Sequence, residues 1–100
     1  MSVKRSQSKN DGSLSVFEKL QRKELARQRK RGEVPSHHHA LSTVQEEVAE
    51  YQKQVWKRRR SRDRLNMAHE LVQVAARAQQ AAEDLLSDKL DELFSEMDVD

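Results

Sequence analysis

Residues 57–64, KRRRSRDR, hold the densest concentration of charge in the sequence. Six Lys or Arg side chains against Asp63 give this basic cluster a net charge of +5. Wound on a helix, the six would cover every face, so a phosphate backbone or an acidic protein surface would be attracted in any register. Short runs of this kind also serve as nuclear-import signals. The residues predicted to bind an anionic partner or an import receptor are Lys57, Arg58, Arg59, Arg60, Arg62 and Arg64. The alternative is a solvated, purely structural stretch of charged helix.

Ser61 lies inside the basic cluster, directly after three arginines. Basophilic kinases prefer a serine in that position, so we predict that Ser61 is phosphorylated. A phosphate carries up to about two negative charges at neutral pH. The modification should therefore weaken the binding of an anionic partner.

Other kinds of chemistry have little support. Residues 37–39 are three adjacent histidines, and such neighbours do not present good ligand geometry to one ion. The sequence has no cysteine, which excludes thiolate metal sites, disulfides and cysteine nucleophiles. It also lacks a glycine-rich phosphate loop and a nucleophile–base pair within a plausible pocket. We predict a protein that is not an enzyme and has neither a metal nor a cofactor.

Composition predicts an all-α, elongated protein. Hydrophobic residues make up 35% of the 100 residues, charged residues 36% and aromatic residues only 4%, which is little material for a compact core. Two glycines and one proline leave few turns for a β fold. Neither an apolar run long enough to span a membrane nor a secretory signal is present. We therefore expect a cytoplasmic or nuclear location without membrane contact.

Four segments are predicted along the chain. In the second, Ser15 and Glu18 have the spacing of a capping box, and Gly32 suits the end of that helix. The segments are a disordered basic tail (residues 1–13), a short basic amphipathic helix (14–31), a linker (32–41) and one long coiled-coil-like helix (42–97).

The long helix is predicted because neither Gly nor Pro follows Pro35. A helix from about residue 41 to 97 would be roughly 85 Å long, at 1.5 Å per residue. The linker is then too short to bring the first helix back onto the last quarter of the long one. Its C-terminal end is acidic, because residues 83–100 hold eight acids against Lys89. This charge opposes the helix dipole, so we expect it to face a basic partner or a basic segment of another copy.

Apolar residues follow heptad spacing on both sides of the basic cluster, in one continuous frame that is interrupted by Arg58 and Arg62. Trp56, beside Tyr51 and Val55, is an additional candidate for an interface hot spot. The predicted coiled-coil or partner interface comprises Leu41, Val44, Val48, Tyr51, Val55, Trp56, Leu65, Val72, Leu86, Leu90, Leu93, Phe94 and Met97.

A heptad run directly after basic residues superficially resembles a basic-leucine-zipper protein over residues 57–93. However, an Asn followed by paired alanines does not precede the arginines, so the base-reading residues of that family are missing. We predict a non-enzymatic coiled-coil interaction protein, a subunit or adaptor of a larger cytoskeletal, centrosomal or nuclear assembly. It binds protein partners through its helical stripe, and a homo-oligomer is left open. The alternatives are a nucleic-acid-associated basic helical protein, and a small regulator that docks its acidic C-terminal helix into a groove of a partner.

Overall fold

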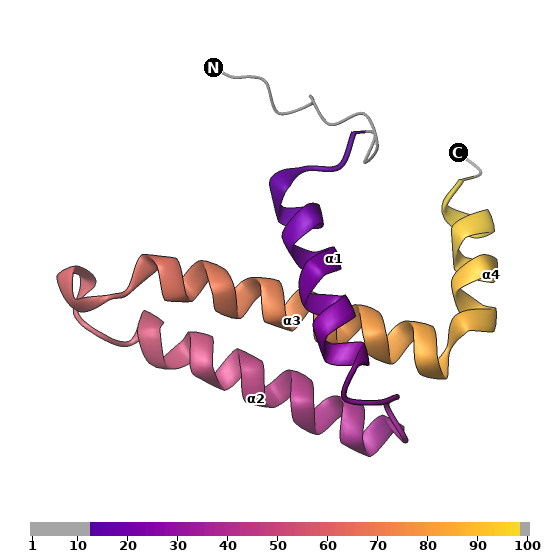
Figure 1. Cartoon of the computed structure of the whole chain (residues 1–100), viewed down its shortest axis with the longest axis horizontal. Coiled ribbons are helices and arrows are strands. Elements are labelled where there is room, and N and C mark those ends of the chain that lie inside the picture. Colours follow the sequence, from indigo (N-terminus) through magenta and orange to yellow (C-terminus); the bar gives the residue numbers. More distant parts are fainter. Residues whose placement is uncertain (1–12, 99–100) are drawn as a thin grey trace.

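The computed structural model describes residues 13–98, and the regular elements within them are all helices (Figure 1). The elements are α1 (Val16–Arg29), α2 (His37–Val55), the short 3-10 helix η1 (Arg59–Ser61), α3 (Arg64–Leu85) and α4 (Ser87–Met97). The all-α prediction is confirmed. The basic tail predicted over residues 1–13 lies, apart from Ser13, outside the described residues.

Helix α1 forms where its local signals place it. The amide of Glu18 donates to Ser15 Oγ at 3.1 Å, and the amide of Ser15 donates to Glu18 Oε1 at 2.7 Å, which completes the capping box. Gly32, with a positive φ of 120°, ends this segment and turns the chain. Ser36 then caps α2 by accepting a hydrogen bond from the amide of His39 at 3.1 Å. The three adjacent histidines therefore lie in the first turn of α2, and not in the expected linker.

The single long helix predicted over residues 42–97 is wrong, because the chain breaks at the basic cluster. A helix there would place like charges three and four residues apart, which destabilises it. Asp63 offers a better arrangement: its Oδ1 accepts from the amide of Asn66 at 3.0 Å and so begins α3 as an N-cap. Its own amide donates to Gln54 Oε1 at 3.2 Å, and Arg62 Nη2 donates to the carbonyl of Val55 at 2.6 Å. These bonds close the turn between α2 and α3.

The break folds the chain back on itself. Helices α2 and α3 lie side by side and antiparallel, and α1 crosses α3 (Figure 1). The radius of gyration is 15.9 Å, somewhat above the roughly 13 Å of a compact 100-residue domain and far from an extended rod. Because residues 80–84 now lie beside the α1–α2 connector, the first helix does reach the last part of α3. The expectation that the linker could not span this distance is therefore also wrong.

The core is small and lies where α3 meets both other helices. Its buried apolar side chains are Leu25 of α1, Ala40 of α2, and Val72 and Ala76 of α3. Four polar side chains, Glu24, Gln28, Glu70 and Gln80, are buried as well. With so little apolar area removed from water, polar contacts between helices carry an unusual share of the specificity.

A second break separates α3 from α4 at Leu86, which ends one helix and begins the other with φ −135° and ψ 30°. Glu83 and Asp84 lie at the C-terminus of α3, where the helix dipole disfavours acids, whereas Asp88 lies in the first turn of α4, where the dipole favours one. Helix α4 extends from the end of α3 and meets the rest of the described chain chiefly at that junction (Figure 1).

Candidate functional site

The basic cluster forms the exposed turn between α2 and α3. Arg62 is half-buried and holds the turn through its bond to Val55, so it is not presented to a ligand. The other five predicted binding residues are exposed, and none has an ion-pair or side-chain hydrogen-bond partner among residues 13–98: Lys57, Arg58, Arg59, Arg60 and Arg64. Ser61 is also exposed, at the end of η1. The turn therefore presents five cations around an accessible hydroxyl.

The predicted apolar interface divides into three parts. Val72 is buried in the core and Val44, Tyr51 and Val55 are half-buried, so this part of the stripe is covered within the chain. Trp56 and Leu65, on either side of the basic cluster, are 76% and 84% exposed. The remaining members are exposed on α2, at the α3–α4 junction and on α4: Leu41, Val48, Leu86, Leu90, Leu93, Phe94 and Met97.

Helix α4 has no buried residue. Its apolar side chains nevertheless share one face, because Leu90, Leu93, Phe94 and Met97 recur at intervals of three, one and three residues. They border an open hollow of about 330 Å³, and Phe94 and Met97 are both more than 70% exposed. Acidic side chains occupy much of the remaining surface. Helix α4 is thus an amphipathic helix whose apolar face is uncovered.

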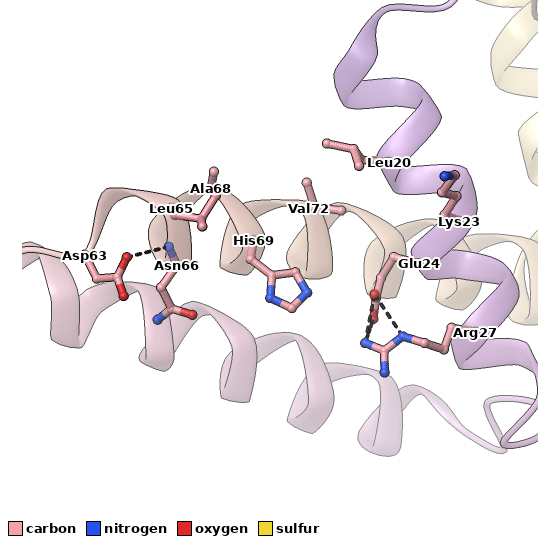
Figure 2. Close-up of a pocket in the computed structure, with 10 residues that line it drawn as sticks. All are labelled: Leu20, Lys23, Glu24, Arg27, Asp63, Leu65, Asn66, Ala68, His69 and Val72. Carbon is pink, nitrogen blue, oxygen red and sulfur yellow. Dashed lines mark hydrogen bonds and ion pairs between the residues drawn. The ribbon is translucent and has the colours of Figure 1, made fainter.

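A groove of about 570 Å³ lies between α1 and the first half of α3 (Figure 2). We call it the α1/α3 groove; the residues that line it are Leu20, Lys23, Glu24, Arg27, Asp63, Leu65, Asn66, Ala68, His69 and Val72. Leu20 extends from α1 over the side of α3 from which Ala68 and Val72 project (Figure 2). Glu24 is held by Arg27 at 2.9 Å, and Asp63 by its role as N-cap. Sequence reasoning missed this groove, since it exists only once the chain has folded back.

Asp84 joins three segments, which was also not predicted. Its Oδ1 accepts from Arg29 Nη1 of α1 at 2.8 Å, and its Oδ2 accepts from the amide of Val34 in the connector at 2.9 Å. The hydrogen bond from Arg29 is the largest cause that lowers the pKa of Asp84, and the bond from Val34 is the next. Nearby, Gln80 Nε2 donates to the carbonyl of Gly32 at 2.9 Å. The acids at the end of α3 therefore serve a basic segment of the same chain.

Glu47 of α2 and Glu70 of α3 form an acidic pair between the two helices, in which Glu70 is buried and Glu47 is half-buried. Burial raises the pKa of Glu70, and the charges of Glu47 and Glu50 raise it further. Gln73, in the amide orientation that suits its neighbours, donates to Glu47 at 3.2 Å and to Glu70 at 3.3 Å. Arg77 lies 3.5 Å from the carboxylate of Glu47. These groups lessen the repulsion, yet Glu70 remains more easily protonated than an exposed glutamate.

We expect Glu70→Gln to stabilise the fold at neutral pH by about 1 kcal/mol, because the amide adds a hydrogen bond to Glu47 and removes a like charge. The pKa of Glu70 in the folded state lies above the ordinary value of 4.5. The cost of burying its ionised carboxylate is therefore absent below about pH 4.5 and grows as the pH rises through the folded pKa. The stabilisation by Glu70→Gln should therefore be smaller in acid. Urea unfolding across this range measures the change, with Glu46→Gln, at an exposed position of α2 that does not act on Glu70, as the control. Equal stability of Glu70→Gln and wild type at neutral pH would contradict this account.

Two further findings concern the described residues. They contain no group of three His, Cys, Asp or Glu side chains placed to hold a metal ion. None of their helices combines the length and the apolar content needed to cross a membrane. The sequence matches no family model, and it has no significant similarity to a curated protein or to a solved structure.

Proposed function

We propose that the chain is a non-enzymatic helical interaction protein, a subunit or adaptor of a larger intracellular assembly, and that α4 is its docking helix. One observation carries the proposal: α4 gathers four large apolar side chains on one face and buries none of them. Such a face normally lies against another surface.

The energetics support docking. An isolated helix of 11 residues is marginal in water, and α4 gains little from the rest of the chain. Burying the side chain of a leucine, phenylalanine or methionine lowers the free energy by roughly 1.5–3 kcal/mol relative to leaving it exposed. A groove that accepts Leu90, Leu93, Phe94 and Met97 would therefore both stabilise α4 and bind it. This is helix-in-groove recognition, and the acids around the apolar face select a groove with a basic rim.

A photo-cross-linking amino acid at Phe94 tests the proposal in the cells that make the protein. We expect it to form an adduct with one defined protein, which mass spectrometry then identifies. The matched control is the same amino acid at the neighbouring Ser95, which is exposed on the polar side of α4 and should react far less. No adduct at Phe94, or equal adducts at both positions, would overturn the proposal.

A second function, anionic-partner binding by the basic cluster, is favoured by its five exposed cations that have no partner within residues 13–98. A nucleic acid and an acidic protein are distinguished by salt, since log K falls with log salt by about 0.9 for each phosphate contacted on duplex DNA. Titration of a short labelled duplex, followed by fluorescence anisotropy, gives that slope. A steep slope would favour nucleic acid, whereas negligible binding to the duplex would leave only an acidic protein as the partner.

We expect Ser61→Asp to weaken duplex binding several-fold and to make the salt slope shallower, because it places a negative charge among the five cations. Ser42→Asp makes the same change at an exposed position of α2 outside the basic cluster, and it should bind like wild type. If the two variants bind equally, Ser61 does not regulate this surface.

A further inference from the structure

We propose that α4 of one chain docks into the α1/α3 groove of a second copy, and that the second copy returns the contact. This inference rests on the proposed role of α4 as a docking helix and names its partner. Two features of the chain are left uncovered, an apolar helix face and an apolar groove, and each has the properties that the other requires.

The groove has an apolar wall of the right length. Leu65, Ala68 and Val72 follow one another along α3 at helical spacing, and Leu65 is 84% exposed. From Leu65 to Val72 the helix rises about 10 Å, and from Leu90 to Met97 α4 rises by the same amount, at 1.5 Å per residue. Leu20 of α1 closes the other side of the groove (Figure 2). The apolar face of α4 therefore matches the apolar wall in extent and spacing.

The α4 of the same chain cannot fill this groove. It begins directly at Leu86, with no linker after α3. The distance back along α3 from Leu86 to Val72, the nearest lining residue on that helix, is about 21 Å, whereas α4 extends about 16 Å. Even folded flat against α3, α4 would end short of the groove. An α4 that occupies the groove must therefore come from another chain.

The charges of α4 and of the groove rim favour a second copy of this chain as the partner. Residues 87–98 hold five acids against Lys89, a net charge of −4. On the groove side, Lys23 lies at the rim without an ion-pair partner among the described residues, and Arg64 adjoins Leu65 at the start of α3, next to the basic cluster. The acids near the end of α4, Glu96 and Asp98, would approach Lys23 and Arg64.

The shape of the chain allows the contact to be reciprocal. Helices α1 and α4 extend from the same side of α3, α1 near its middle and α4 at its end (Figure 1). A copy related by a two-fold axis would place its α4 beside the first chain's α1, and it would receive the first chain's α4 in the same way. A stable interface buries about 800 Å² per partner, so each of the two contacts needs about half of that.

Sedimentation equilibrium of the purified full chain tests the proposal. Wild type should be a dimer that weakens with salt. Phe94→Asp removes the apolar face and should be monomeric. Ala68→Trp fills the groove at an exposed position, and Leu65→Asp makes its wall polar, so both should also be monomeric. The matched control Leu41→Asp alters an exposed leucine outside both surfaces and should remain a dimer. Circular dichroism establishes that each variant is as helical as the control.

Mixing the variants gives the decisive result. Phe94→Asp keeps an intact groove and Ala68→Trp keeps an intact α4, so an equimolar mixture should form heterodimers that neither variant forms alone. This heterodimer keeps one of the two contacts, so it should be weaker than the wild-type dimer. A chain carrying both substitutions has neither surface intact and should bind neither variant. A dimeric Ala68→Trp would overturn the proposal, because α4 would then pair elsewhere, for example with another α4. A monomeric wild type would overturn it too, yet α4 would keep its docking role if Phe94 still cross-links to a different protein.

Discussion

Replacing Ala76 with phenylalanine should lower the free energy of unfolding by about 1–3 kcal/mol, the usual cost of overpacking a close-packed site. Ala76 is the most deeply buried residue of the described chain, with 0% of its surface exposed. It lies at the middle of α3, the helix that packs against both α1 and α2. A methyl group lets the helices approach closely there. A phenyl ring would force at least one of them away.

The loss should be large relative to the total stability. Only four apolar side chains among residues 13–98 are buried, and small domains with little buried surface are marginally stable. Urea unfolding followed by circular dichroism measures the change. Ala78→Phe provides the control, since it makes the same substitution at an exposed position of the same helix. An unchanged unfolding midpoint for Ala76→Phe would mean that α3 does not pack between α1 and α2 as described.

The elements that sequence alone predicts correctly are those whose signals are local. The helix-forming composition predicts the all-α class, and the capping box of Ser15 and Glu18 places the start of α1 within two residues. Both depend on residues close together in the chain. Even here the buried face of α1 is only partly apolar: Leu25 is buried together with Glu24 and Gln28, whereas Phe17 and Leu20 are 43% and 46% exposed.

The break at the basic cluster is the main feature that the sequence reasoning missed. Treating Gly and Pro as the only signals that end a helix left residues 42–97 continuous. The stronger signals were the mutual repulsion of six cations and the N-cap Asp63. Each such interaction contributes only about a few tenths to one kcal/mol, so neither is conspicuous in the sequence. Once the chain turns there, Val44, Tyr51 and Val55 of the heptad stripe are half-buried within the chain, whereas Leu41 and Val48 stay exposed.

The candidate site was predictable only in part. The basic cluster and the apolar face of α4 are continuous in sequence, so composition and spacing identify them. The α1/α3 groove joins Leu20 to Leu65 and Ala68, and the Asp84 site joins residues 50 or more positions apart. Such pairs follow from the direction of the fold-back, which the heptad pattern does not encode.

Replacing Asp84 with alanine should release α1 and the connector from α3. The substitution removes a charge-assisted bond from Arg29 and the bond that satisfies the amide of Val34. Well-buried hydrogen bonds to charged groups contribute about 1.5–3 kcal/mol to stability, and the exposure of Arg29 reduces the contribution of its bond. We therefore expect Asp84→Ala to lower the free energy of unfolding by about 2 kcal/mol. Hydrogen exchange should show the α1 amides losing protection before those of α2, because the α2–α3 contact does not depend on Asp84.

Glu83→Ala is the matched control, because Glu83 binds the same Arg29 but is far more exposed and holds no backbone amide. Glu83→Ala should lower the free energy of unfolding by about 0.5 kcal/mol. The pKa of Asp84 is lowered below its ordinary value of 3.8, chiefly by the hydrogen bond from Arg29, so its stabilisation is complete above that pH and is lost as the pH falls through the folded pKa. The difference in stability between wild type and Asp84→Asn should therefore narrow in acid. A difference that does not change with pH would mean that Asp84 acts through packing alone, and that the charge of Arg29 does not hold α1 in place.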